Sequence, residues 1–448
     1  MDQLRDFLAQ HPHIHHASPS SPDFETLREA FVIKPTVPAM IVRPRSAEDV
    51  AGLLGVLKEN NLPFTIRVGG HDMFGRSQVQ DAITIDLREI AYIHVDRDNL
   101  SARVGGGVLF VDLIKELSRN DVAVPHPLVA TVGYVGWATH AGYGLLTPKF
   151  GLGADQILQA KVVDAQAVVR DADEDMLTAI RGGGGAVGVI VELTIKVYPL
   201  EQILAGFLVL ESSDLPATIR RYTDAYRQQS EEGLPAELNL QPSVLNGPAG
   251  KAMAVFFVWA SSDITAGQKW LSKVNTWSPV VMSTVAPTTV AGFHESIKDV
   301  LPKAVYGHAF TVNFHEFTPE VVEVISKHAL LQPGDPATLI SIHQLRDCAP
   351  EPVEKSVFGT RCPHFVLEIL PCVLDKNKLD ETVAWGNDFY NDMMRIDTEN
   401  LLPSTFLALT ETSKVNMRKI YGQQYETLAR LKKQYDPGNL FKLALVQL

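Results

Sequence analysis

The chain has 448 residues and a formal net charge of −12, with 46% hydrophobic and 21% charged residues. This is the composition of a globular protein of two or three domains with a large hydrophobic core. The negative charge and the lack of a basic cluster argue against a nucleic-acid partner, because phosphate binding needs clustered lysine and arginine.

The N-terminal half is predicted to mix short strands and helices, with glycine-rich turns after several strands. Residues 1–33 read as a helical lead-in with a loop at Ser18–Pro22. A helix begins at Ser46, a good N-cap followed by acidic residues. Further elements are strands over Ala39–Val42, Phe64–Val68, Ala82–Leu87 and Ser101–Val104, and a helix over Leu109–Leu117.

After Pro199 glycines thin out, and alternating apolar runs indicate sheet. The predicted strands are Leu204–Leu210, Met253–Ala260, His308–Phe314, Thr338–Gln344 and Phe365–Leu370, and the predicted helices are Leu215–Gln228 and Thr265–Val274. This pattern predicts one antiparallel sheet carrying helices. Residues from about Phe406 onward are expected to return to the first domain.

The cysteines and the N-terminus indicate the cellular compartment of the protein and whether it binds a metal. The cysteines Cys348, Cys362 and Cys372 lack Cys-x-x-Cys spacing, so we expect buried thiols in a reducing compartment and no zinc. The N-terminus has no apolar signal-peptide core, and no apolar run reaches transmembrane length. We therefore expect a cytoplasmic protein. The histidines between His11 and His16 are interpreted as a solvated segment rather than a metal site.

The most informative stretch is residues 67–77, which begins Arg67-Val68-Gly69-Gly70-His71-Asp72 and ends at Ser77. It follows a predicted strand and presents a histidine directly after a Gly-Gly turn, where a ligand can approach the backbone closely. Taken alone, this stretch equally fits a turn histidine that bonds its own loop. Arg67 fits two roles, an ion pair with an anionic cofactor group or an anchor for the loop.

Three other stretches complete the pattern. Two are glycine-rich, Val132–Gly144 and Ile180–Ile190, and the third is Tyr435-Asp436-Pro437-Gly438-Asn439-Leu440-Phe441. Gly105-Gly106-Gly107 lacks the spacing of a Rossmann fingerprint. Together, in this order, the four motifs resemble the berberine-bridge-enzyme-like branch of the vanillyl-alcohol-oxidase superfamily. The short, nicotine-oxidase-like and fungal members are the most similar.

This resemblance implies an α+β fold with two domains. The PCMH-type FAD-binding domain would comprise 1–201 and 405–448, with its core at about 34–200. A substrate domain with an antiparallel sheet flanked by helices would comprise 202–404.

The resemblance also implies FAD linked covalently to His71. Val129 stands where bicovalent relatives carry a cysteine, so we expect a single link. The expected cofactor-binding residues are Arg67, Val68, Gly69, Gly70, His71, Asp72, Ser77, Thr131, Val132, Gly133, Val135, Gly136, Thr139, Gly142, Gly144, Val189, Ile190 and Asn439. No metal is expected.

The expected reaction is hydride transfer from a small, largely apolar alcohol, phenol or amine to flavin N5, with reoxidation by O2, in natural-product metabolism. Polar groups look sparse on the strands expected to cover the flavin, which favours selection by shape. The catalytic candidates are Glu368, His140 and Tyr306. Burial of Glu368 would raise its pKa towards neutrality and suit it as a base, unless it faces solvent.

Departures from the family pattern keep other functions open. His140 stands where a glycine is expected, as a new acid or base or as a space-filler. Ala186-Val187, Thr178 and Ala408 also differ from common family residues. One alternative is a redox-neutral isomerase or cyclase that uses FAD as a scaffold. A weaker one is a binding protein without turnover.

Overall fold

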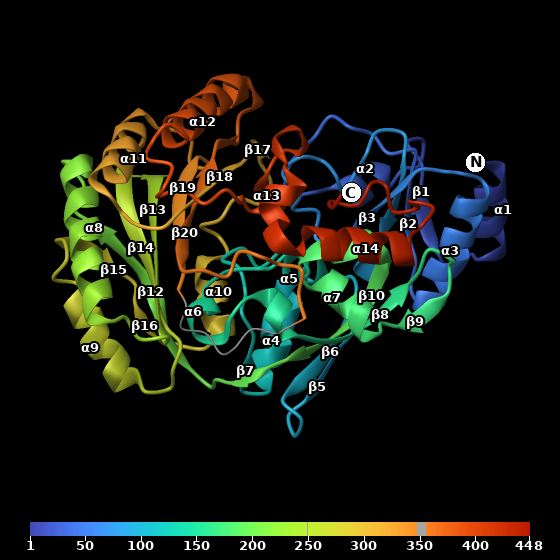
Figure 1. The fold of residues 1–448 in the computed structure, drawn as a ribbon, viewed down its shortest axis with the longest axis horizontal. Helices are drawn as coiled ribbons and strands as arrows, with labels where there is room; N and C mark the ends of the chain where they lie inside the picture. Colours follow the sequence, from blue (N-terminus) through green and yellow to red (C-terminus); the bar gives the residue numbers. More distant parts are fainter. Residues whose placement is uncertain (249, 347–354) are drawn as a thin grey trace.

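The computed structural model describes residues 1–248, 250–346 and 355–448. Figure 1 shows two halves. One combines the blue-to-green part of the chain with the red C-terminal helices α13 (Met417–Tyr421) and α14 (Tyr425–Tyr435). The other, light green to orange, is built on one large sheet. This arrangement agrees with the predicted α+β class, whereas the domain boundaries at 201 and 405 stay a prediction.

The first sheet leads to the histidine loop, defined here as residues 67–77. Its strands, in order, are β1 (His15–Ala17), β2 (Met40–Arg43), β4 (Ile83–Asp86) and β3 (Phe64–Arg67). β2 and β3 pair in parallel with β4. The helix α3 (Ala47–Glu59) between β2 and β3 is capped by the Ser46 hydroxyl, which accepts from the Asp49 N–H at 3.1 Å. His71 therefore lies just beyond the end of a parallel strand.

The second sheet is antiparallel and leads to the glycine turn, defined as residues 182–185. Its strands, in order, are β5 (Ile93–Asp96), β6 (Ser101–Gly105), β10 (Val189–Lys196), β8 (Ile157–Val163) and β9 (Val169–Asp171). The helix α7 (Glu174–Gly183) runs into this turn. Its N-terminus is capped by the Asp173 side chain, which accepts from the Met176 N–H at 2.9 Å.

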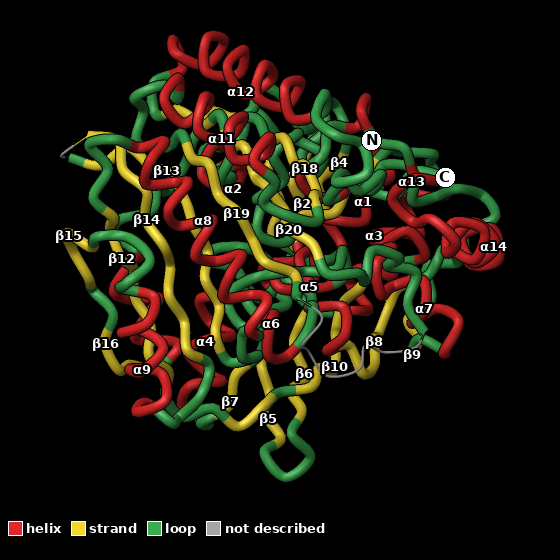
Figure 2. Tube along the Cα trace, turned by 60° about the vertical axis from the view of Figure 1, so that its left-hand side comes forward, coloured by secondary structure: helices red, strands yellow, loops and turns green. Residues whose placement is uncertain are grey.

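The large sheet is antiparallel and carries helices on its outer face (Figures 1 and 2). Its strands, in order, are β15 (Val280–Ser283), β12 (Ile203–Leu210), β14 (Gly250–Trp259), β13 (Leu238–Gly247), β19 (Leu339–Leu345), β20 (His364–Leu370) and β18 (Phe310–Phe314), with β16 (Ala286–Thr288) beside β12. The outer helices are α8 (Leu215–Glu232), α9 (Ile264–Val274), α11 (Pro319–Leu331) and α12 (Leu379–Met393). On the inner side, α6 (Thr147–Phe150) lies against β13 and β19.

Further elements connect these sheets. The helices are α1 (Asp2–Gln10), α2 (Phe24–Arg28), α4 (Phe110–Arg119), α5 (Tyr134–Ala138) and α10 (Val290–Ile297), and the short paired strands are β7 (Val122–Ala123) with β11 (Tyr198–Pro199) and β17 (Tyr306–Gly307) with β21 (Cys372–Val373). The 3₁₀ turns are Leu87–Glu89, Gly153–Gln156, Gly184–Val187, Lys376–Lys378, Leu407–Leu409, Thr412–Lys414 and Gly422–Gln424.

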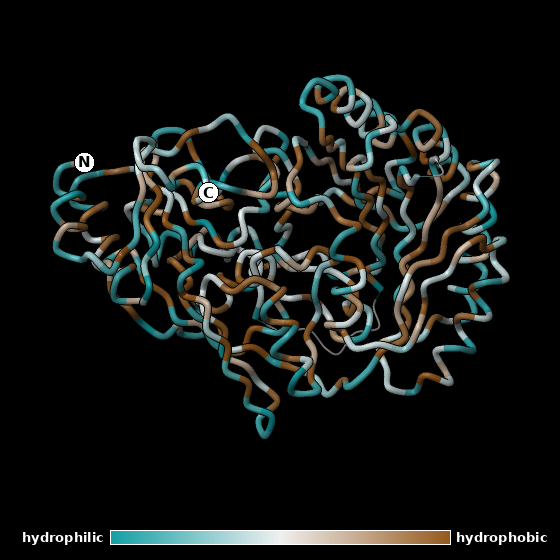
Figure 3. The backbone as a smooth tube through the Cα atoms, turned by 180° about the vertical axis from the view of Figure 1, so that it is seen from behind, coloured by the Kyte–Doolittle hydropathy of each residue, from teal (hydrophilic) through white to brown (hydrophobic). Residues whose placement is uncertain are grey.

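The hydrophobic residues follow this architecture. Figure 3 shows brown, hydrophobic segments through the sheets and teal on exposed parts such as the β5–β6 hairpin loop. One buried cluster joins the large sheet to its outer helices, and another joins the first sheet to α1 and α3. A third includes residues of the second sheet, α4, α7 and α14. Each sheet thus buries at least one face, as a stable layered fold requires.

The predicted strands and helices are confirmed with shifts of a few residues at their ends. The N-terminal segment is an exception, because His15–Ala17 forms β1 against β2, whereas residues 1–33 were predicted as a helical lead-in with a loop at Ser18–Pro22. The prediction of a buried thiol is wrong for Cys362, which is exposed, and is confirmed for Cys372, which is buried. Cys348 lies outside the described residues. In the described parts of the chain, no helix is long and apolar enough to cross a membrane.

Candidate active site

His71 is presented by a turn that needs glycine. Gly70 has φ +71°, a conformation that side-chain-bearing residues rarely adopt. The His71 ring stacks on Phe31 with centroids 4.4 Å apart, and its Nε2 lies 2.9 Å from the Thr131 hydroxyl. Burial lowers the pKa of His71 to about 4, so the imidazole is neutral at pH 7. If Nε2 donates its hydrogen to Thr131, Nδ1 keeps a lone pair and is a nucleophile.

The rest of the histidine loop is tied to the C-terminal part of the chain. The Asp72 carboxylate accepts from the N–H groups of Phe74 and Arg76 at 2.9 and 2.8 Å and pairs with the Arg76 guanidinium at 2.7 Å. Arg76 also donates to the carbonyl groups of Ala408 and Thr410. Ser77 lies half-buried at the end of the loop. These bonds hold the loop beside residues 406–411.

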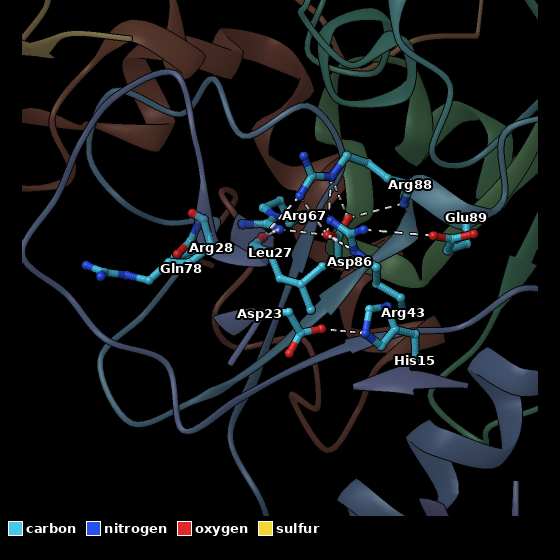
Figure 4. A network of polar contacts seen from close by, with 10 residues as sticks. All are labelled: His15, Asp23, Leu27, Arg28, Arg43, Arg67, Gln78, Asp86, Arg88 and Glu89. Atoms are coloured by element: carbon cyan, nitrogen blue, oxygen red, sulfur yellow. Dashed lines mark hydrogen bonds and ion pairs between the residues drawn. The ribbon is translucent and has the colours of Figure 1, made fainter. Parts of the chain in front are cut away.

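Arg67 serves as an anchor, which is one of its two predicted roles. Figure 4 shows its guanidinium directed at Asp86 of β4, at 2.6 Å, with Arg43 and Arg88 on the same carboxylate at 2.8 and 2.9 Å. Arg67 also bonds the Leu27 carbonyl oxygen. Arg67 and Asp86 are both fully buried. The three arginines hold the pKa of Asp86 down to about 2 despite its burial, which alone would raise it.

Replacing Asp86 with asparagine is expected to destabilise the fold by about 3 kcal/mol, because Arg67 would keep its buried charge without a partner. The pKa of Asp86 in the folded state lies below its ordinary value of 3.8. Its contribution is therefore present above pH ~4 and is lost as the pH falls towards 2. Urea unfolding at pH 7 and at pH 3 measures both effects. An unchanged midpoint at pH 7 would contradict this role.

The second motif, defined as residues 131–144, packs against the histidine loop. Cβ atoms built on Gly142 and Gly144 would lie 2.6 Å from the Trp137 ring and 1.9 Å from the His126 carbonyl oxygen. The packing of the protein itself therefore requires glycine at both positions, apart from any role beside a cofactor. Gly136, in contrast, borders open space in the described structure.

Similar close packing and backbone bonds join the remaining predicted cofactor residues. A Cβ on Gly69 or Gly133 would clash with the other motif. The Thr139 hydroxyl donates to the Val135 carbonyl, and the Thr139 carbonyl accepts from the Gly182 N–H at 2.9 Å. Contacts with FAD stay predictions for all of these residues, including Val189 and Ile190 at the start of β10.

Asn439 is separated from this region. It lines a cavity of about 470 Å³ with Pro63 and Phe64, at the start of β3, whereas His71 follows the end of that strand. The structure therefore does not bring Asn439 together with His71.

Glu368 of β20 lies on the inner face of the large sheet, and its side chain is 13% exposed. The Tyr143 hydroxyl donates to its Oε1 at 2.5 Å, and His343 Nε2 lies 3.3 Å from Oε2 as an ion-pair contact. Burial acts to raise the pKa of Glu368, but His343 and Tyr143 outweigh it and lower the pKa below its ordinary value. The predicted rise towards neutrality is therefore wrong, and the group is a carboxylate at pH 7.

Neither Tyr143 nor His343 was among the predicted catalytic residues. Tyr143 lies in the second motif, between Gly142 and Gly144, so its position among required glycines was the available signal. Its ring contacts Phe406 with centroids 4.5 Å apart and His343 at 4.7 Å. Tyr143 thus joins the second motif to the large sheet and to the segment that Arg76 holds.

The other two predicted catalytic residues, His140 and Tyr306, form no hydrogen bond or ion pair with Glu368 in the described structure. His140 donates Nδ1–H to the Gly136 carbonyl at 2.9 Å, and its ring fills the space beside Gly184, where a Cβ would lie 2.3 Å away. Burial lowers its pKa to about 4. Its ring therefore fills this space, which is one of its two predicted roles, and the acid or base role stays a prediction. Tyr306 is half-buried in β17 opposite Val373, and its catalytic role stays a prediction.

The comparisons with known proteins agree with this geometry. A model described as FAD binding domain matches residues 38–173, and one described as berberine and berberine like matches 410–445. The FAD-linked oxidoreductase aurO of Gibberella zeae is 30% identical over 431 residues, which cover 94% of this chain and 83% of the relative. The chain belongs to the berberine-bridge-enzyme-like family of FAD-linked oxidoreductases.

Solved structures show the same fold. The 6-hydroxy-D-nicotine oxidase from Arthrobacter nicotinovorans superposes with a TM-score of 0.83 at 21% identity, over 96% of this chain and 97% of that one. Glucooligosaccharide oxidase from Acremonium strictum, whose FAD is 6-S-cysteinyl and 8α-N1-histidyl, gives 0.83 at 17% identity over 98% and 97%.

The residues present fit FAD in this berberine-bridge-like enzyme. The His71 ring is neutral at pH 7, and a Cβ on Gly136 of the second motif would meet nothing within 4 Å in the described part of the chain. Nε2 of His140 is buried, and no donor within the described ranges reaches it. A polar group of a bound cofactor would satisfy that nitrogen.

Proposed function

We propose that the protein is an FAD-linked oxidase that holds FAD through His71 alone and oxidises a small alcohol, phenol or amine with O2 as the final acceptor. The observation that carries this proposal is the Glu368 carboxylate, held ionised by His343 and Tyr143 beside the second motif. FAD, when bound, supplies a two-electron acceptor that O2 can reoxidise.

Glu368 is the base of the proposed reaction. It would accept the proton of the substrate O–H or N–H. Bound FAD would take up the hydride, from the adjacent C–H of an alcohol or amine or from a conjugated benzylic C–H of a phenol, so the substrate would lose two electrons and two hydrogens. A carboxylate in a partly apolar site is a competent base once it is ionised. The surroundings suit this role, because Leu152, Leu345 and Val366 pack around Tyr143 on the inner face.

Tyr143 orients this base and stays protonated. Burial and the neighbouring carboxylate raise the pKa of Tyr143 well above its ordinary value. Its O–H therefore remains a donor throughout the working pH range. By fixing Oε1 of Glu368, it leaves Oε2, with His343 beside it, to face the reacting proton.

Tyr143→Phe is expected to shift the acid limb of the kcat/KM profile towards higher pH. The carboxylate would lose a hydrogen bond that lowers its pKa, so it would become protonated at a higher pH. The matched control is Tyr222→Phe in α8, whose buried hydroxyl has no partner within residues 1–248, 250–346 and 355–448. If the acid limb of Tyr143→Phe stays at the wild-type pH, the hydrogen bond from Tyr143 does not lower the pKa of Glu368.

The single covalent link is proposed from the chemistry of His71 and from Val129. A neutral imidazole would form a bond to the 8α carbon of FAD with loss of its N–H and of one 8α C–H, and the two electrons would reduce FAD, which O2 would reoxidise. Glucooligosaccharide oxidase, a structural neighbour, carries FAD on both a histidine and a cysteine. A valine side chain offers no nucleophile for a second link.

Oxygen consumption with a panel of small alcohols, phenols and amines tests the proposed function. An oxidase is expected to consume O2 and release one H2O2 for each product that is two hydrogens lighter. A product of unchanged mass, formed without O2 uptake, would instead support the isomerase or cyclase alternative on the same fold.

A further inference from the structure

The inner face of the large sheet is polar around Glu368, contrary to the expectation of sparse polar groups. The strand register places Ser243, Ser341, Glu368 and Thr311 in one row across β13, β19, β20 and β18. Side chains directly opposite each other in paired strands project from the same face. The neighbouring row contains His343 and Asn313 on either side of Val366.

The opposite face shows that this polarity is specific to one side. The alternate residues of the same strands, such as Leu240, Val244, Ile340 and Ile342, are apolar and buried in the cluster with the outer helices. Side chains alternate between the faces of a strand, so the polar residues share the inner face, turned away from α8 and α11. Asn239 confirms the direction, because it donates to the Leu145 carbonyl just after the second motif.

Several groups of this inner face are buried without partners. Oγ1 of Thr311, Oδ1 of Asn313 and Oε1 of Gln241 have none among the described residues, although the side chains are only 3–4% exposed. Gln241 donates its amide to Ser341 Oγ at 2.8 Å, which leaves its oxygen to accept. A buried polar atom without a partner costs about 1–3 kcal/mol, so a ligand that bonds these atoms would gain stability.

The chemistry of the three groups narrows what they bind. Each is neutral and offers an oxygen lone pair. The amide oxygens of Asn313 and Gln241 only accept, so they match hydrogen-bond donors, whereas the Thr311 hydroxyl can accept or donate. An ammonium group would be drawn to Glu368 itself, the one carboxylate in the row. Hydroxyl groups are the neutral donors that fit a row of amide and hydroxyl oxygens.

We propose that the substrate carries at least one hydroxyl group besides the group that is oxidised, and that Thr311, Asn313 and Gln241 bind it. This inference rests on the proposed function, because it takes Glu368 as the site of proton removal. Thr311 lies directly opposite Glu368, so it is placed to bind a hydroxyl near the reacting carbon. Asn313 and Gln241 are the specificity-determining residues on either side.

Matched probes test the wild-type enzyme first. Benzyl alcohol is compared with its 3-hydroxyl and 3,4-dihydroxyl derivatives, and cyclohexanol is compared with the cyclohexanediols. The rates of anaerobic flavin bleaching and the changes in flavin absorbance on titration are measured for each. The hydroxylated member of a pair is expected to react or bind about tenfold better. If no hydroxylated probe exceeds its partner, the proposal is overturned.

Thr311→Val and Asn313→Leu then assign the contact. Each is expected to reduce the preference for the hydroxylated probe by about tenfold, mainly through a higher KM for that probe. Thr84→Val is the matched control, because Thr84 is a strand threonine of the first sheet with an equally buried, unpartnered hydroxyl. Equal losses for both members of a pair would overturn the proposal. Failure of every probe to bleach a flavin that is present would count against the proposed function itself.

Discussion

Glu368→Gln is expected to lower kcat/KM by about a thousandfold, because the substrate proton would lose its acceptor. The amide has nearly the same shape as the carboxylate, so the bond from Tyr143 and the fold should persist. Rapid mixing of the anaerobic enzyme with substrate measures the effect as the rate of flavin reduction. Flavin content and thermal midpoint should stay at the wild-type level.

Glu192→Gln is the matched control for this substitution. Glu192 lies in β10 of the second sheet, its side chain is 12% exposed, and it accepts from the Tyr92 hydroxyl at 2.6 Å. It therefore shares the strand setting and the tyrosine partner of Glu368 but lies in a different sheet. Flavin reduction should be nearly unchanged in this variant. A loss below tenfold in Glu368→Gln would contradict its role as the base.

His71→Ala is expected to abolish acid-stable flavin completely. Acid precipitation of the wild type should leave a yellow, fluorescent pellet, because the covalent bond survives unfolding. The variant should release its flavin into the supernatant and turn over more slowly, since part of the enzyme would lack FAD.

The control for this experiment is His94→Ala, which removes an exposed histidine from β5. Its pellet should stay yellow. Colour in the supernatant of the wild type would contradict the covalent link. It would favour the alternative of a redox-neutral isomerase or cyclase that uses FAD as a scaffold. Colour that persists in the His71→Ala pellet would place the link on another residue.

Local signals in the sequence were sufficient for most elements. Ser46 caps its helix as its residue type and the following acids predicted, and the alternating runs such as Phe365–Leu370 became strands of one antiparallel sheet. These signals act over a few residues, so they can be read without knowing the fold. The strand His15–Ala17 was missed because it exists only through pairing with β2, which lies more than twenty residues later.

The contacts of the candidate site could not be predicted from local sequence patterns, because they join residues that are far apart in the chain. Tyr143 and Glu368 are 225 residues apart in the chain. His343, with a smaller effect from the Tyr143 hydrogen bond, reverses the expected direction of the Glu368 pKa shift. The sequence left both predicted roles of Arg67 possible. The structure shows that Arg67 donates to Asp86, nineteen residues later, which is the anchoring role. The polar inner face was missed for the same reason, because each strand contributes only one or two polar residues and the register assembles them.

Anaerobic titration of the purified enzyme with substrate tests the central claim most directly. The account predicts that the flavin absorbance bleaches with one substrate consumed per flavin, that it returns when air is admitted, and that Glu368→Gln bleaches far more slowly. Product formed under anaerobic conditions over many turnovers, with the flavin absorbance unchanged, would contradict it and establish a redox-neutral reaction.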